Sequence, residues 1–375
     1  MPVDSDLGFR HNHIQTDGGR NVSQSGPVLD KIWQTFSGEG AWQTVADLSR
    51  FHRIQASPGF RQAVRYLQRE LDDAGLTTEV LSFPADHETR FWAWPSFQEW
   101  DCSEASLDLI QPRDERCRLA DFRASPISLI QRSAPYEGEA EVVVLDDDEE
   151  PEDYEGLDVR GKVVLSRGGL RRVWELAVRE RGAVGILFDG MRPLPPVRPP
   201  GDLQDIRQYT SFWWEPGDTP CFGFVLTPRQ GQRLRGLLET PGTSVMVSAR
   251  VISRLYDGSL EVLSALIPGF PETASDLREG GASTGQETGA SGNQEEVLVV
   301  AHLCHPQPSA NDNASGAAAS LEAARTLSTL ISNGGLPSPK RAIRFLWLPE
   351  MTGTYAYLSG CRQDMHRCIA GINLD

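Results

Sequence analysis

The sequence predicts an α/β fold, in which a sheet of successive strands is flanked by helices. Residues 297–300 form an apolar run that is typical of a buried strand. Residues 341–348 and 369–374 predict two further strands at the intervals of an α/β chain. Between the first two of these strands, apolar residues recur at the spacing of one helix face, at Leu321, Ala324, Leu327 and Ile331.

The earlier part of the chain supplies more elements of both kinds. Helices are predicted at 28–36 and 42–51, followed by an amphipathic helix whose apolar stripe is Val64, Leu67, Leu71 and Ala74. We expect strands at 77–83, 140–145, 162–167, 184–189 and 259–267, and one more helix at 171–181. Aromatic residues within 84–102 favour a cap over the core more than a pocket, whereas Trp213 and Trp214 are candidates for a cleft wall.

Composition limits the partners of this chain. The net charge is −16 and the pI is about 4.9, which argues against nucleic acid or an anionic membrane as a partner. No stretch approaches the roughly 18 apolar residues of a membrane span. The acidic run at 146–155 is interpreted as a solvated face and not as a metal site. Whether the chain forms a homo-oligomer stays open.

The cysteines predict a reducing compartment. The six cysteines lack CxxC spacing, and the amino-terminal residues lack the apolar region of a secretory signal. We therefore expect a cytoplasmic protein with free thiols. Cys304 beside His305 could be a nucleophile, but adjacent residues of an extended segment point apart, and no orienting partner is evident.

Ionisable side chains follow three of the predicted strands. His302 ends the first strand and Asp312 lies ten residues later, where the next helix begins, while Glu350 and Asp375 follow the other two strands. The carboxyl ends of such strands are where open α/β sheets bind ligands. A single histidine and aspartate could be a hydrogen-bonded surface pair, but imidazole and carboxylate groups together are zinc ligands. The four residues predict a metal-dependent active site.

The order of these motifs resembles the zinc aminopeptidases of the transferrin-receptor and glutamate-carboxypeptidase type. HLCHP (302–306), ANDNASG (310–316) and PE-x-x-G (349–353) resemble, more narrowly, a bacterial aminopeptidase-like branch described as a domain of unknown function. Residues 50–76 resemble the opening helices of the family, and residues 156–169 with 177–190 resemble the protease-associated domain that many members contain. The resemblance covers about residues 41–375.

The resemblance implies a fold and a division into domains. The expected fold is the mixed sheet of the zinc exopeptidases, flanked by helices, with an inserted β-rich protease-associated domain. The catalytic domain would comprise residues 28–125 and 256–375, and the inserted domain residues 126–255, after a disordered tail at 1–27. A Gly/Ser/Thr/Glu-rich insertion at 271–296 would interrupt the catalytic domain. Family members carry a further histidine ligand after the position of Asp375, so we expect a chain truncated at its carboxyl end, inactive alone.

The resemblance also implies roles for the site residues. His302 and Asp375 would bind one zinc ion, and Asp312 would bridge it to a second. Glu350 would be the general base that takes a proton from the attacking water.

The chain departs from the family pattern at two positions. Cys304 replaces the aspartate of a His-x-Asp motif, and Met351 replaces the second residue of a Glu-Glu pair. His305 is then the substitute ligand, and one or two zinc ions are expected.

The first interpretation is a zinc-dependent exopeptidase, namely an aminopeptidase that hydrolyses peptide or aminoacyl substrates with water activated by zinc. Another zinc-dependent amide hydrolase on the same scaffold is an alternative. A catalytically silent, peptide-binding relative is a third, from a different class. Glu350 argues against the silent relative, because a binding module needs no base beside a metal.

Overall fold

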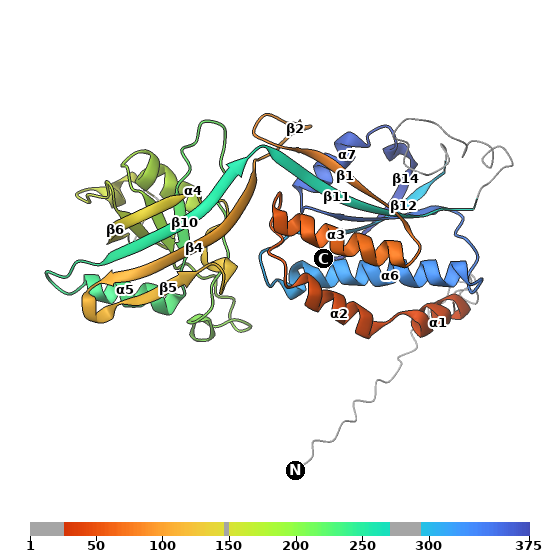
Figure 1. The fold of residues 1–375 in the computed structure, drawn as a ribbon, viewed down its shortest axis with the longest axis horizontal. Coiled ribbons are helices and arrows are strands. Elements are labelled where there is room, and N and C mark those ends of the chain that lie inside the picture. The colour runs from red at the N-terminus through yellow and green to blue at the C-terminus, as the bar shows by residue number, and fades with distance from the viewer. Residues whose placement is uncertain (1–25, 146–149, 271–293) are drawn as a thin grey trace, which may run out of the picture.

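The predicted strands and helices are present in the computed structural model, which describes residues 26–145, 150–270 and 294–375. One group of strands forms a sheet in the order β1–β11–β13–β12–β14 (Figure 1). β11 pairs antiparallel with β1 and β13, whereas β12 pairs parallel with β13 and β14, so this sheet is mixed. Its strands are β1 (Thr77–Ala85), β11 (Gly258–Ile267), β12 (Glu296–His302), β13 (Ala342–Leu348) and β14 (Cys368–Asn373).

Helices cover both faces of this sheet. α2, α3 and α6 pack on one face, and α7 packs on the other (Figure 1). α1 lies against α6. The bounds of these helices are α1 (Gly26–Thr35), α2 (Gly38–Leu48), α3 (Pro58–Asp73), α6 (Gly316–Ser332) and α7 (Thr352–Gly360).

The amphipathic helix predicted from the sequence is α3. It begins at Pro58 because the Ser57 hydroxyl accepts a hydrogen bond from the Phe60 amide and thereby caps the first turn. The predicted stripe faces the sheet, with Val64 and Leu67 buried there. Apolar burial at helical spacing therefore fixes α3 on the sheet, as the sequence predicted.

Seven further strands form a second sheet in the order β5–β4–β10–β6–β7–β8–β9. Pairing is antiparallel from β5 to β6 and parallel from β6 to β9. α4 and η5 pack on one face of the parallel half and α5 on the other. These elements are β4 (Glu99–Gln111), β5 (Cys117–Asp121), β6 (Tyr136–Val144), β7 (Val163–Ser166), α4 (Leu170–Val173), η5 (Trp174–Arg179), β8 (Gly185–Phe188), β9 (Phe222–Val225), α5 (Pro228–Leu238) and β10 (Met246–Tyr256).

Two long strands of the second sheet were not predicted. β4 and β10 pair antiparallel from the junction of the two sheets outward (Figure 1). Because β4 and β5 precede residue 126, the predicted start of the inserted domain lies inside the run of strands that builds this sheet. The sheet therefore begins at Glu99, and helices pack on its parallel half, which makes the second unit mixed α/β and not only β-rich.

Short elements complete the described chain. A two-stranded hairpin, β2 (Arg90–Phe91) and β3 (Trp94–Pro95), lies between β1 and β4. The remaining helical turns are η2 (Arg113–Glu115), η3 (Pro126–Ser128), η4 (Pro151–Tyr154), η6 (Pro200–Leu203), η7 (Ala310–Ser315) and η8 (Met365–Arg367).

An ionic network joins α3 to both sheets. The Arg61 guanidinium donates to Glu99 at 2.9 Å and to Glu261 at 2.8 Å. The Tyr256 hydroxyl and the Ser259 amide donate to the same Glu99 carboxylate, at 2.6 Å and 3.1 Å. Burial alone would raise the pKa of Glu99, but these bonds outweigh burial and lower the pKa. The Glu99 carboxylate is therefore ionised, buried and well partnered.

Replacing Glu99 with alanine is expected to lower the free energy of unfolding by about 2 kcal/mol, because Arg61 then loses its buried partner. The matched control is Asp101→Ala on the same strand, which breaks an exposed pair with Arg254 (3.2 Å). That control should cost less than about 1 kcal/mol. Urea denaturation followed by tryptophan fluorescence measures both, and equal losses would show that the Glu99 network does not stabilise the junction.

Three sequence predictions lie wholly or largely outside the described residues. They are the tail at 1–27, the first part of the acidic run at 146–155 and most of the insertion at 271–296. Among the helices that the structure does describe, none has the length and apolar character needed to cross a bilayer.

Candidate metal centre

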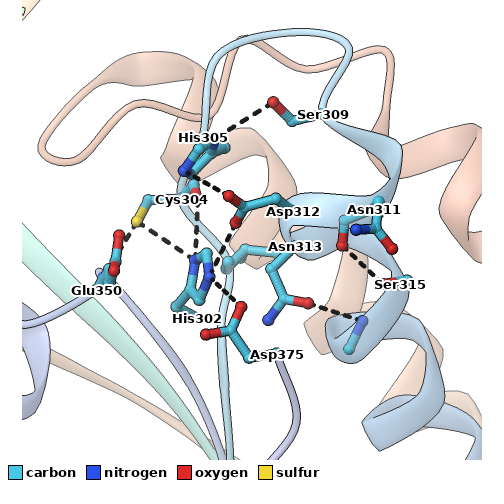
Figure 2. A network of polar contacts seen from close by, with 12 residues as sticks. His302, Cys304, His305, Ser309, Asn311, Asp312, Asn313, Ser315, Glu350 and Asp375 are labelled. Carbon is cyan, nitrogen blue, oxygen red and sulfur yellow. Dashed lines mark hydrogen bonds and ion pairs between the residues drawn. The ribbon is translucent and has the colours of Figure 1, made fainter. Parts of the chain in front are cut away.

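The four ionisable residues predicted from the sequence meet at one edge of the mixed sheet (Figure 2). His302 is the last residue of β12 and pairs with the last residue of β13, so these parallel strands end together. Glu350 follows two residues after the end of β13, and Asp375 two residues after the end of β14. Asp312 lies in η7, where φ is −107° and ψ is 98°, which turns the backbone out of the helical path just before α6.

His302 and two carboxylates form the centre of this group. His302 Nε2 lies 3.2 Å from Asp312 Oδ1 and 3.1 Å from Asp375 Oδ1 (Figure 2). One ligand atom from each of the three residues lies within 4.8 Å of the other two. The His302 side chain is 6% exposed, whereas those of Asp312 and Asp375 are 57% and 58% exposed. The cluster therefore has a buried imidazole on its inner side, and its two carboxylates are open to solvent.

The orientation of the His302 ring fits a metal ligand. Its Nδ1 lies 3.1 Å from the backbone carbonyl oxygen of Cys304, which is the contact of a protonated Nδ1 that donates. In a neutral ring Nε2 then presents a lone pair to two carboxylate oxygens, so three acceptor atoms converge without a proton between them. A divalent cation at that point would be coordinated by all three. One imidazole and two carboxylates with an open side fit zinc.

The DNASG sequence positions the two carboxylates relative to one another. Asn313 is fully buried and donates from Nδ2 to the Leu374 carbonyl oxygen at 2.8 Å, and its Oδ1 accepts from the Gly316 amide at 2.9 Å. A Cβ atom at residue 316 would lie 2.3 Å from the same Leu374 oxygen, so only glycine permits this approach. The residues that flank Asp312 and Asp375 are thereby tied together.

A second imidazole contacts the other carboxylate oxygen of Asp312. His305 Nε2 lies 3.4 Å from Asp312 Oδ2 and 3.1 Å from the Tyr209 hydroxyl. Burial lowers the pKa of His305, which keeps the ring neutral and able to bind a metal. Within the described ranges, no group of three or more metal-ligating side chains includes His305. A second metal position there would therefore have an incomplete ligand set.

Arg53 shapes the loop that carries His305. Its fully buried guanidinium donates to the carbonyl oxygens of Leu303 (2.9 Å) and Ser309 (3.0 Å), and its own carbonyl oxygen accepts from the His305 amide (2.8 Å). Burial lowers the pKa of Arg53 to about 10, while the Asp312 charge acts in the opposite direction. The side chain thus keeps a positive charge at neutral pH beneath the carboxylate cluster.

Cys304 holds the turn that presents Glu350. The Glu350 amide donates to Cys304 Sγ at 3.1 Å, and the exposed Glu350 carboxylate has an oxygen within 4.8 Å of a His302 ring nitrogen (Figure 2). Cys304 is 2% exposed, and burial raises the pKa of its thiol to about 12. A protonated, buried thiol is a poor nucleophile, so the geometry favours a structural role for Cys304.

Two residues at the site were not predicted from the sequence. Arg53 lies in the segment that resembles the opening helices of the family, but nothing in that segment indicates that its guanidinium reaches Ser309. Tyr209 belongs to the second sheet's part of the chain and reaches His305 across the junction (3.1 Å). Contacts across so many residues have no local sequence signal.

Several solved structures share this fold, although no curated protein matches the sequence significantly. A peptidase M28 precursor from Shewanella amazonensis SB2B is 15% identical, with a TM-score of 0.59 over 92% of this chain and 72% of that chain. BSAP, a zinc aminopeptidase from Bacillus subtilis, is 15% identical, with a TM-score of 0.56 over 90% and 69%. An aminopeptidase from Aneurinibacillus sp. strain AM-1 is 18% identical, with a TM-score of 0.52 over 92% and 71%.

At these identities the likeness establishes the fold. A protein-family model matches residues 42–375, and the chain therefore belongs to the family described as "Domain of unknown function (DUF4910)".

Proposed function

We propose that this protein is a zinc-dependent exopeptidase, and specifically an aminopeptidase. The observation that carries the proposal is the convergence of His302 Nε2 with oxygens of Asp312 and Asp375, at 3.2 Å and 3.1 Å, beside the exposed carboxylate of Glu350. The fold supports it, because two of the similar structures are described as aminopeptidases, one of them a zinc enzyme. The substrate would be a peptide or an aminoacyl compound.

The residues would divide the work as follows. His302, Asp312 and Asp375 would hold zinc, which supplies Lewis acidity that polarises the scissile carbonyl and acidifies water. Glu350 would take a proton from the water as its oxygen attacks the carbonyl carbon. The C–N bond then breaks, and the same carboxyl group returns the proton to the leaving nitrogen. The exposed position of Glu350 allows water and substrate to reach it.

The charges around the site support one tightly bound zinc ion. Three carboxylates, Asp312, Asp375 and Glu350, lie near two buried guanidinium groups, those of Arg53 and Arg132. Both guanidinium groups lie close enough to Cys304 to interact with it electrostatically, and burial lowers both pKa values only to about 10. Three carboxylates and two guanidinium groups sum to a charge of −1, so one divalent cation brings this group to +1, whereas two would bring it to +3 and leave a large excess of positive charge.

We therefore expect the purified protein to bind one zinc ion tightly and a second, at Asp312 Oδ2 and His305, only weakly. His305→Ala should remove the weak site and retain the tight one, because His305 Nε2 contacts Asp312 Oδ2, whereas His302 Nε2 contacts Asp312 Oδ1. Isothermal titration with zinc, together with elemental analysis after dialysis, measures both sites. Loss of the tight site in His305→Ala would instead make His305 a principal ligand.

The function is tested by hydrolysis of aminoacyl p-nitroanilides with the zinc-loaded protein. Release of p-nitroaniline that stops after chelation and returns with zinc supports an aminopeptidase. Hydrolysis of N-acylated amides, with free amines left intact, would support the alternative zinc-dependent amide hydrolase. Peptide binding without any hydrolysis would support the catalytically silent relative.

We also propose that the second sheet is the inserted protease-associated-like domain. The segments 156–169 and 177–190, on which the resemblance rests, contribute β7, η5 and β8 to that sheet and its covering helix. The unit would extend from the start of β4 to the end of β10, since these paired strands leave and return at the junction.

A further inference from the structure

A cavity of about 410 Å³ opens beside the candidate metal centre. Glu350 lies in its wall, so the cavity begins where the proposed general base is. Its wall includes Trp94 from the β2–β3 hairpin, Phe97 just after that hairpin, and Trp213 from the second sheet's part of the chain. A cavity of this size holds a group larger than one aliphatic side chain.

The walls of this cavity are aromatic and held in place. The Trp94 indole stacks on Tyr355 at 4.9 Å between ring centroids and donates to the Thr352 hydroxyl at 3.0 Å. The edge of Phe97 meets Trp213 at 5.1 Å, and Trp213 is nevertheless 50% exposed. Aromatic residues within 84–102 therefore line a pocket as well as cap the core, because Phe97 belongs to a buried cluster too.

Arg132 fixes Trp213 from behind. Its guanidinium carbon lies 4.3 Å from the Trp213 ring and 4.5 Å from the Phe97 ring, and the residue is 2% exposed. Among the described residues, no carboxylate lies within ion-pair distance of Arg132, whose Nη2 donates to the Gln55 carbonyl oxygen at 3.2 Å. Arg132 therefore lies behind the aromatic wall, and the charged side chains that line the cavity itself include Arg90, Glu215 and Glu350.

One buried polar atom of the cavity wall has no hydrogen-bond donor as a partner in the described part of the chain. Gln55 Oε1 is buried and has no hydrogen-bond partner among the described residues, and Gln55 lines the cavity. A buried acceptor without a partner is unfavourable, and an N–H group of a bound substrate would satisfy it. The cavity therefore combines aromatic walls with one acceptor for an amide or amine.

We propose that this cavity binds a bulky, uncharged aromatic side chain of the substrate residue next to the scissile bond. The inference rests on the proposed function and names the substrate class of that same site. Trp213 would be the stacking surface and a specificity-determining residue, and Arg132 a positioning residue that holds the Trp213 ring through their cation–π contact. The second sheet thereby contributes directly to substrate choice.

The test compares phenylalanine, leucine, alanine and lysine p-nitroanilides. The phenylalanine compound should have the highest kcat/KM, and Trp213→Ala should lower that value by on the order of 10-fold or more with little change for alanine. Trp213→Phe should restore much of the preference. Trp42→Ala is the matched control, because Trp42 is 63% exposed on α2 and does not line the cavity. An equal loss for all four substrates, or a lysine substrate as good as phenylalanine, would overturn the proposal.

A binding experiment separates this inference from the proposed function. Phenylalaninamide, alaninamide and lysinamide are titrated calorimetrically into the parent protein and Trp213→Ala. Tighter binding of phenylalaninamide that is lost in Trp213→Ala supports the pocket even if no anilide is hydrolysed. Hydrolysis without any aromatic preference in binding or in kcat/KM would support the proposed peptidase activity but reject the proposal that the cavity binds an aromatic side chain.

Discussion

Replacing His302 with alanine is expected to abolish tight zinc binding and, with it, aminopeptidase activity. His302 supplies the only nitrogen of the tight site, and its ring is already oriented by the Cys304 carbonyl oxygen at 3.1 Å. Without it, two carboxylates remain, which are weak zinc ligands when they stand alone. The dissociation constant for zinc should rise by on the order of 100-fold or more, since removal of even an outer partner of a ligand costs 10- to 100-fold.

Elemental analysis and zinc titration measure this effect. The control is His366→Ala, because His366 is exposed and its ring nitrogen contacts only a nearby carbonyl oxygen, that of Gln363. The control should bind zinc as the parent does. If His302→Ala retained the parent's zinc content, His302 would not be a ligand of this site.

The composition of the candidate centre could be predicted because it depends on local patterns. Each ionisable residue follows an apolar strand, and strands of one open sheet bring their carboxyl ends together. The structure places His302, Asp312 and Asp375 within contact distance for this reason. The roles of these residues, and that of Glu350, stay predictions until metal content and turnover are measured.

The second sheet was harder to predict, and its longest strands were missed. In β4 the buried residues Ala105, Leu107 and Leu109 alternate with polar ones, which is a strand pattern. The aromatic residues around the start of β4 instead favoured the prediction of a loop that caps the core. The pairing of β4 with β10 spans many residues, and no local preference of either segment specifies it.

The substrate side of the site was largely invisible in the sequence. Trp213 was identified as a candidate for a cleft wall, but its partners Phe97 and Arg132 come from distant segments. The burial of Arg132 and the unpaired oxygen of Gln55 appear only when the two sheets are assembled. A pocket differs from a core cap in which side chains line it and which of its polar atoms lack partners, and both depend on the assembled structure.

Replacing Glu350 with glutamine is expected to leave the zinc content and the fold intact and to lower turnover by on the order of 100-fold or more, the usual scale of acid–base catalysis. Glutamine keeps the size and hydrogen-bonding shape of the side chain but cannot accept a proton at neutral pH. The hydrogen bond to Cys304 Sγ is donated by the backbone amide of residue 350 and not by its side chain, so the turn should persist. Turnover of the anilide substrates and zinc content are measured on the same sample.

The alternative role for Glu350 is that of a zinc ligand, because one of its oxygens lies within 4.8 Å of donor atoms of His302 and Cys304. A ligand and a base respond differently to the substitution. Loss of zinc together with turnover would assign Glu350 to the metal, whereas retained zinc with lost turnover assigns it to proton transfer. Glu39→Gln serves as the matched control, because Glu39 is exposed on α2 and belongs to neither group of metal-ligating side chains. Full activity of the Glu350→Gln protein with its zinc retained would eliminate both roles for Glu350, and another group would then have to take the proton from water.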